Sequence, residues 1–230
     1  EISACLVGSE MCIRDRTFLD GVPLNTTPAV VHPAELLDGA VVSGYYSSGA
    51  IRNPTYMHQR NPIVEELFAH HAAGELEFVG MIVTQCLINP YQEKLRSASL
   101  AARMARLLGA DGVIISIEEC GHAYADLMLT CQACEDVGLK TVLLMAESAG
   151  AQGDKPAALA FARDADAVVS VGNMDERLVL PPMARVLGGQ AFAEAWGPAG
   201  PVQGPAETSL EHILAATCQV GPGHLRGDRG

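Results

Sequence analysis

The sequence has few aromatic residues, few basic residues and no long apolar run. These shortages exclude, in turn, an aromatic core, polyanionic partners and a membrane span. Aromatic residues make up 5% of the 230 residues and apolar residues 49%. The core must therefore consist of Ala, Val, Leu, Ile and Met, which suits close packing of helices on a sheet. Lys and Arg number 15 against 27 acidic residues, a formal net charge of -12. With no basic cluster, nucleic acid and anionic membrane surfaces are excluded as partners. No apolar run reaches the roughly 18 residues of a membrane span.

Disulfide, nucleotide and metal motifs are missing as well. The seven cysteines are scattered, which is not a disulfide framework in a chain of this length, so we expect a reduced, cytoplasmic protein. No G-x-G-x-x-G or P-loop follows a strand-like run, so no nucleotide cofactor is expected. Cys120, His122, Cys131 and Cys134 do not have a common zinc spacing. The C-x-x-C pair within this set falls in mid-helix, where nothing stabilises a thiolate. No metal is expected.

Residues 1–16 differ from the rest of the chain. They read EISACLVGSEMCIRDR and show no strand or helix period. They have neither the basic start nor the small-residue cleavage site of a signal peptide. The segment resembles translated sequencing-adapter read-through. We therefore expect residues 1–16 to lie outside the fold, and the natural chain to begin near Thr17.

From Phe78 onward, short apolar runs alternate with helical stretches. The runs are apolar on both faces, as buried parallel strands are; they cover 78–85, 112–119, 141–148 and 166–173. Helical spacing covers 91–108 and 123–137, with a shorter stretch at 156–163. This alternation predicts right-handed βαβ units. The fold class is therefore α/β, with a doubly wound, Rossmann-like parallel sheet and flanking helices.

The composition divides the chain into four parts. After residues 1–16 comes an irregular N-terminal segment, 17–76, with a strand expected at 40–46 and a helix at 62–73. The α/β domain covers 77–196. Residues 197–230 form a Gly/Pro-rich tail, with a short helix expected at 210–217.

Candidate functional residues follow the predicted strands. Ligands of an open parallel sheet collect at the carboxyl ends of its strands. These ends carry Cys86, then Glu118, Glu119 and Cys120, then Glu147-Ser148 and Gly172-Asn173. Cys86 is a candidate nucleophile if His58 or His122 folds near it as a base. The alternative is an inert buried thiol.

A second kind of chemistry is suggested by Ser47-Ser48-Gly49. A serine on a strained turn can attack the preceding carbonyl, shift the chain to an ester and eliminate. The new N-terminus is then a pyruvoyl group, whose carbonyl can form a Schiff base with an amine and act as an electron sink. Without further support, Ser-Ser-Gly indicates only a turn.

Several segments together resemble one family. They are NTTPAVVHPAELLDGAVVSGYY (25–46), NPTYMHQRNPIVEELF (53–68), ADGVII (110–115), DLMLTCQACEDVGLKTV (126–142), AVVSVGN (167–173) and LPPMARVLGG (180–189). The family is the glycine/sarcosine/betaine reductase component B precursor, with the proline-processing subunit of D-proline reductase as a relative. The likeness is to the later half of the precursor, so an N-terminal half is expected to be missing.

The resemblance implies a subunit of a hetero-oligomeric amine reductase complex. Such a subunit binds a small amine whose C–N bond is cleaved reductively. The dithiol or selenol donor comes from a selenocysteine-containing component B subunit and the other reductase components. In the family, an internal cysteine becomes the pyruvoyl group. Here no cysteine lies between Arg16 and Cys86. Three possibilities remain open: the group comes from Ser47 or Ser48, it comes from Cys86, or the chain is not processed.

The resemblance also assigns a substrate site. Tyr45, Tyr46, Ser47, Ser48, His58 and Gln59 are expected to build it, and Glu118, Glu119 and Cys120 to line it from the sheet side. Acidic groups suit a cationic ammonium through charge-assisted hydrogen bonds. Two alternatives stay open. One is an unprocessed, non-catalytic binding or scaffold subunit of the same fold. The other is a stand-alone α/β thiol enzyme of the racemase or lyase kind that uses Cys86 and Cys120.

Overall fold

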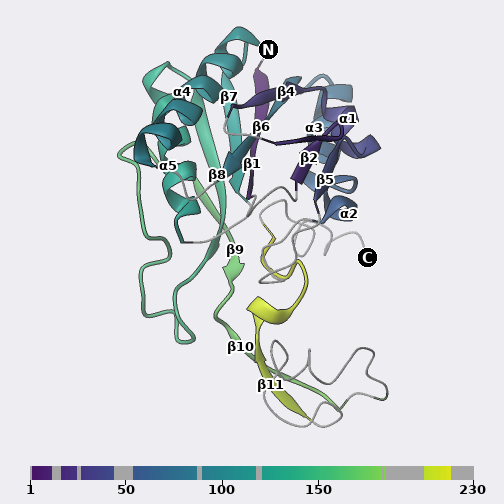
Figure 1. Cartoon of the computed structure of the whole chain (residues 1–230), viewed down its shortest axis with the longest axis vertical. Coiled ribbons are helices and arrows are strands. Elements are labelled where there is room, and N and C mark those ends of the chain that lie inside the picture. The colour runs from purple at the N-terminus through teal and green to yellow at the C-terminus, as the bar shows by residue number, and fades with distance from the viewer. Residues whose placement is uncertain are drawn as a thin grey trace.

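A mostly parallel sheet forms the centre of the computed structural model (Figure 1), which describes residues 2–11, 17–24, 27–43, 54–86, 90–117, 121–182, 184 and 205–218. Its six strands have the order β4-β6-β1-β7-β8-β9. They are β1 (Ser3–Met11), β4 (Ala29–Val31), β6 (Glu77–Cys86), β7 (Gly112–Ile117), β8 (Lys140–Glu147) and β9 (Val168–Asn173). All neighbours are parallel except β4, which pairs antiparallel with β6 at one edge. The predicted α/β fold with a parallel sheet is confirmed.

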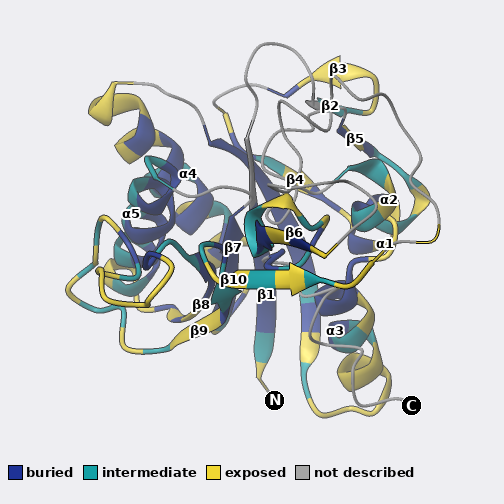
Figure 2. Ribbon diagram, turned by 90° about the horizontal axis from the view of Figure 1, so that it is seen from below, coloured by how far each residue is buried: buried dark blue, intermediate teal, exposed yellow. Residues whose placement is uncertain are grey.

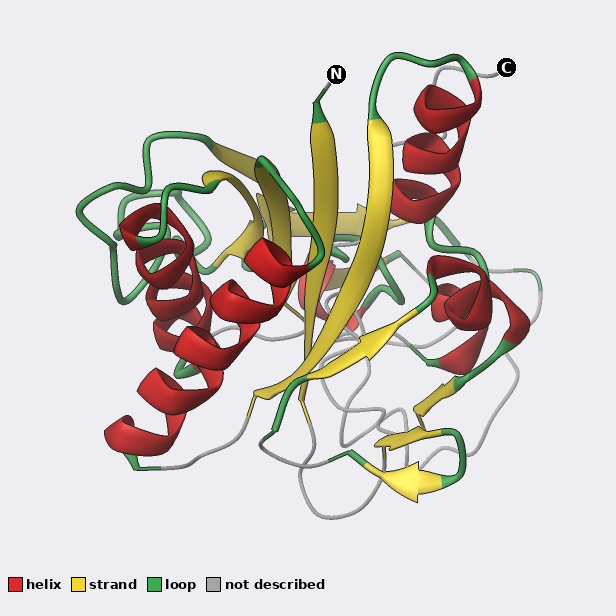
Figure 3. Ribbon diagram, turned by 90° about the horizontal axis from the view of Figure 1, so that it is seen from above, coloured by secondary structure: helices red, strands yellow, loops and turns green. Residues whose placement is uncertain are grey.

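Helices cover both faces of this sheet (Figure 3). Helices α4 (Tyr91–Leu107) and α5 (Ala123–Asp136) pack on one face. Helices α1 (Pro33–Asp38) and α3 (Pro62–Ala72) pack on the other. The buried face of α4 is lined by small side chains, Ala98, Ala101, Ala102 and Ala105. Because alanine projects so little, α4 can lie close to both the sheet and α5.

The two faces form separate hydrophobic cores, because successive side chains of a strand point to opposite sides. In β1, Cys5 and Val7 belong to the core under α4 and α5. Ala4 and Leu6 belong to the core under α1 and α3. All four are buried, and Figure 2 shows β1 dark blue over this stretch. A strand with two buried faces is a central strand.

The prediction that residues 1–16 lie outside the fold is wrong for Ser3–Met11. This segment is β1, and it lies between β6 and β7 in the middle of the sheet. Leu6 lies opposite Met81 on one side and Ile114 on the other. The physical reason is that the apolar run Ala4–Gly8 is short and no helical stretch follows it, so the sequence shows no βα unit there. Residues 12–16 lie outside the described part of the chain.

Smaller elements surround the main sheet. β2 (Thr17–Leu19), β3 (Val22–Pro23) and β5 (Val41–Ser43) form a three-stranded sheet. The antiparallel pair β10 (Arg177–Leu180) and β11 (Ala206–Ser209) extends from the main body (Figure 1). Helix α2 (Thr55–His58) is a single turn. The strand expected at 40–46 is present at Val41–Ser43, and residues 44–46 lie outside the described part.

Two expected helices are absent or shortened. Residues 156–163 are not helical. Ala158, Ala160 and Ala162 pack on the core while Leu159 and Phe161 are exposed, a spacing of two that is typical of extended chain. At 210–217 only η2, a 3-10 turn at Leu210–His212, forms, because Ala215 adopts a positive φ of 59° that a helix does not allow.

No helix among the described residues combines the length and apolarity needed to cross a membrane. The boundaries at 16/17, 76/77 and 196/197 stay predictions.

Candidate functional site

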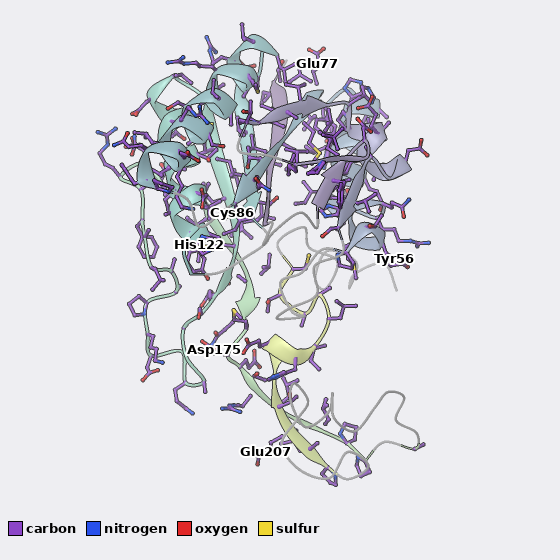
Figure 4. The ribbon with its side chains drawn as sticks, viewed as in Figure 1. Tyr56, Glu77, Cys86, His122, Asp175 and Glu207 are labelled. Atoms are coloured by element: carbon purple, nitrogen blue, oxygen red, sulfur yellow. The ribbon has the colours of Figure 1, made fainter. Side chains whose placement is uncertain are left out.

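The carboxyl ends of the parallel strands meet at one edge of the sheet, as the sequence predicted. β6 ends at Cys86, β7 at Ile117, β8 at Glu147 and β9 at Asn173. Helices α4 and α5 follow β6 and β7 directly, so their N-terminal turns also lie at this edge. Figure 4 shows Cys86 and His122 together there. This edge therefore brings together residues that are far apart in the sequence.

A buried polar cluster lies beneath the N-terminal turns of α4 and α5. The Cys86 thiol donates to Oδ2 of Asp126 at 3.1 Å. Lys94 Nζ donates to the same carboxylate oxygen and forms an ion pair with it. A ring nitrogen of His122 lies within 4.8 Å of both the Cys86 sulfur and the Asp126 carboxylate. The cluster joins a thiol, an imidazole, a carboxylate and an ammonium from β6, α4 and α5.

Because this cluster is buried, its charged groups must compensate one another. Cys86 is 0% exposed, Asp126 8% and Lys94 9%. A buried charge is very costly unless it is paired. Lys94 and Asp126 therefore compensate each other, and a cationic ligand could pair with the Asp126 carboxylate only by displacing Lys94. The other two members of the cluster are the Cys86 thiol and His122 beside it.

Of the two histidines proposed as a base for Cys86, His122 is the one that the structure places near the thiol. His58 is 1% exposed and belongs to α2. Gln59 follows it as the C-cap residue of α2 and is exposed, with its side chain near Gly39 at the end of α1. In the view of Figure 4, Tyr56 of the same helix lies well away from Cys86 and His122.

The other predicted site residues lie outside the described part of the chain. They are Tyr45, Tyr46, Ser47 and Ser48 in the segment 44–53, and Glu118, Glu119 and Cys120 after β7. Ser43 and Thr55, described residues on either side of segment 44–53, are hydrogen-bonded to each other. The side-chain hydroxyl of Thr55 accepts from Ser43 N at 3.1 Å and donates to Ser43 O at 3.4 Å. The chain on either side of residues 44–53 is therefore anchored at one point.

Sequence reasoning missed Lys94 and Asp126. One signal was available for Asp126, because His122 and Asp126 are four residues apart and share one helix face. No comparable signal exists for Lys94. A lysine in the first turn of a helix is normally solvated, and only the packing of α4 on α5 shows that this one is buried.

The ends of β8 and β9 are held together by a second network. The Asn173 side chain accepts from Ala149 N at 3.2 Å and donates to Gly150 O at 2.9 Å. Asp175 accepts from Gly150 N at 2.8 Å. These bonds join backbone to side chains across two loops. The Ser148 hydroxyl also donates to Asp175 Oδ2 at 3.4 Å. Ser148 and Asn173, noted in the sequence as strand-end residues, are therefore loop-anchoring residues.

Cys131 and Cys134 lie in the core at the opposite end of the sheet. Cys131 Sγ is 3.4 Å from the hydroxyl of Thr141, which lies at the start of β8. Both cysteines are 0% exposed. Burial raises the pKa of Cys134 to about 12 and also raises the pKa of Cys131. These protonated, enclosed thiols are packing residues.

Replacing Cys131 and Cys134 together by Ala is expected to lower stability by about 1–3 kcal/mol, because small buried groups are removed. Metal content should not change. In the parent chain, stability should fall as pH rises above about 9, because the unfolded Cys134 thiol ionises there and the folded one does not. Denaturant titrations at several pH values, with metal analysis, check this. Stoichiometric zinc that disappears in the variant would contradict it.

Comparison with known proteins gives one family. The model of "glycine/sarcosine/betaine reductase component B subunits" matches residues 8–225. The chain is 38% identical over 215 residues to glycine reductase complex component B subunits alpha and beta of Peptoclostridium acidaminophilum, covering 91% of this chain and 50% of that protein.

Two further relatives come from the same organism. Betaine reductase complex component B subunit alpha is 38% identical over 161 residues, covering 70% of this chain and 36% of the relative. Sarcosine reductase complex component B subunit alpha is 32% identical over 199 residues, covering 84% and 46%. The chain spans about half the length of its relatives or less. No solved structure matches.

Proposed function

Since this chain belongs to the family of glycine/sarcosine/betaine reductase component B subunits, we propose that it binds a small amine for reductive cleavage of a C–N bond. The cleavage consumes two electrons and two protons, supplied by a dithiol or selenol of a selenocysteine-containing component B subunit and the other reductase components. The chain acts in the cytoplasm as part of a hetero-oligomer. The family match over residues 8–225 is the observation that carries this proposal.

The amine is bound at the carboxyl edge of the sheet, above the polar cluster. Asp126 is already paired with Lys94, so recognition of a cationic ammonium falls to Glu118 and Glu119, which follow β7 in the sequence. Charge-assisted hydrogen bonds to these carboxylates would orient the amine. Cys120 lines the same side. Tyr45 and Tyr46 of the N-terminal segment build the opposite wall, whereas His58 is buried in α2 and Gln59 lies beside Gly39.

Ser47 or Ser48 is the source of a pyruvoyl group. When formed, that group supplies an electrophilic carbonyl and an electron sink. Two observations favour these serines over Cys86. Ser43 and Thr55, which flank residues 44–53, are hydrogen-bonded to each other, so a break in the chain between them leaves both flanks held. Cys86 instead lies in the paired part of β6, opposite Met11 of β1. An attack on the carbonyl of residue 85 would have to disrupt this pairing.

We expect the intact protein, incubated with its partner subunit, to be cleaved before residue 47 or 48 and to take up a carbonyl reagent there. Serine is a weaker nucleophile than cysteine, so cleavage should be slow or partial. Trapping with a hydrazine or borohydride, followed by peptide mass mapping, locates the label. Ser47→Ala or Ser48→Ala should abolish it, and Cys86→Ala should not.

A different label position or none would change the conclusion. Label on a fragment that begins at Cys86 would move the precursor residue to the end of β6. Absence of cleavage and label with the partner subunit present would favour an unprocessed, non-catalytic binding subunit. The lack of any cysteine between Arg16 and Cys86 is the observation that favours that second candidate. Turnover of an amine by the isolated chain would instead favour the thiol enzyme that uses Cys86 and Cys120.

A further inference from the structure

Three ligand-type side chains converge in the buried polar cluster. The donor atoms of Cys86, His122 and Asp126 all lie within 4.8 Å of one another. Within the described ranges, no other set of three His, Cys, Asp or Glu side chains brings its donor atoms together in this way. Asp126 lies in the first turn of α5, His122 is the N-cap residue of that helix, and Cys86 is the last residue of β6. The convergence therefore depends on regular secondary structure.

The chemistry of these donors is that of a transition-metal site. Thiolate sulfur, imidazole nitrogen and carboxylate oxygen are the three ligand types that zinc takes in proteins. Zinc holds sulfur at about 2.3 Å and nitrogen or oxygen at about 2.0–2.2 Å, so ligand atoms in a tetrahedral site lie about 3.3–3.7 Å apart. The Cys86 sulfur and the Asp126 oxygen are 3.1 Å apart. A small adjustment of side chains brings the set to that spacing.

We propose that Cys86, His122 and Asp126 form a binding site for a divalent transition-metal ion of the zinc type. Three protein ligands leave the fourth tetrahedral position open, which is the arrangement of catalytic zinc sites and not of structural ones. No metal was expected from the sequence, because the set considered there, Cys120, His122, Cys131 and Cys134, does not have a common zinc spacing. Only His122 is common to both sets.

Lys94 is the counter-ion that the metal would displace. In the metal-free protein its ammonium neutralises Asp126. On binding, the Cys86 thiol loses its proton to solvent, neutral His122 supplies a ring nitrogen, and Asp126 exchanges the ammonium for the metal. No group is oxidised or reduced. Because Lys94 and the metal compete for one carboxylate, removing Lys94 should strengthen metal binding.

The experiment uses the full chain, freed of metal with a chelator and titrated with Zn²⁺ or Co²⁺ alone. We expect one metal ion per chain and, with Co²⁺, the near-ultraviolet charge-transfer band of a thiolate–cobalt bond. Cys86→Ser, His122→Gln and Asp126→Asn should each weaken binding at least about 100-fold, since even outer-shell changes cost 10–100-fold. Cys131→Ser is the matched control, a buried thiol outside the site, and should bind as the parent does.

Stability gives an independent readout. Free zinc at 100 times its Kd should raise Tm by roughly 5–10 °C in the parent chain. Lys94→Met should melt lower than the parent without metal and gain more from zinc. The proposal is wrong if the parent shows no stoichiometric binding, or if binding survives in both Cys86→Ser and His122→Gln. The site requires neither an amine nor the partner subunit, so a negative carbonyl-labelling result leaves it standing.

Discussion

A chain that lacks residues 1–11 is expected to be unfolded at room temperature. The deletion removes β1 from between β6 and β7. Leu6 and Val7 are each 1% exposed, and they point into different cores. Burial of such side chains contributes about 1.5–3 kcal/mol each. The inner edges of β6 and β7 would also lose their hydrogen-bond partners. Together these losses approach the whole stability of about 5–15 kcal/mol that a domain has.

Point variants test the same strand without a deletion. Leu6→Ala should cost about 2–5 kcal/mol, and Leu6→Asp, which buries a carboxylate, should prevent cooperative folding. Ile2→Ser is the control, because Ile2 is 62% exposed, and it should stay within about 0.5 kcal/mol of the parent. Circular dichroism melts measure all of these. A deleted chain that melts cooperatively within a few degrees of the parent would show that β1 is dispensable.

Breaking the Lys94–Asp126 ion pair on one side is expected to cost about 3–5 kcal/mol, because it leaves the other charge buried and uncompensated. Lys94→Met leaves the Asp126 carboxylate buried without its counter-ion. Asp126→Asn leaves the Lys94 ammonium buried without its counter-ion. The double variant should recover most of the loss, because neither charge then remains in the core. A favourable coupling of several kcal/mol between the two sites is therefore expected.

Urea titrations of the four proteins in this cycle give the coupling directly. Lys140→Met is the matched control. Lys140 also pairs with a carboxylate, that of Glu135 at 3.5 Å, but its side chain is 89% exposed. That substitution should cost less than about 1 kcal/mol. Additive losses at Lys94 and Asp126 would mean that the two side chains stabilise the fold independently and that their contact is incidental.

The sheet was predictable where its strands are apolar on both faces. β6, β7, β8 and β9 each read as a continuous apolar run followed by helical spacing or by turn residues, and all four lie parallel in one sheet as expected. β1 was missed because Ala4–Gly8 is short and has no helical stretch after it. Local pattern also failed at 156–163, where alternating alanines pack as extended chain.

The sequence predicted where the candidate site lies, but not which side chains contact one another there. Parallel strands put Cys86 at the carboxyl edge, and the position of His122 just after β7 placed it near that thiol. Lys94 and Asp126 could not be identified, because helical spacing does not tell which charged residue faces a neighbouring helix. Tyr45, Tyr46, Ser47, Ser48, Glu118, Glu119 and Cys120 lie outside the described residues, so their roles stay predictions.

The central position of β1 also affects the order in which the protein is made. Leu6 leaves the ribosome well before its partners Met81 and Ile114. At about 5–20 residues per second, this apolar strand waits roughly 5–20 s before both neighbours exist. Pairings so distant in sequence also slow the search for the native topology. During that interval the nascent chain exposes an unpaired apolar strand. Its yield in cells should therefore depend on chaperones that shield β1 until β7 is complete.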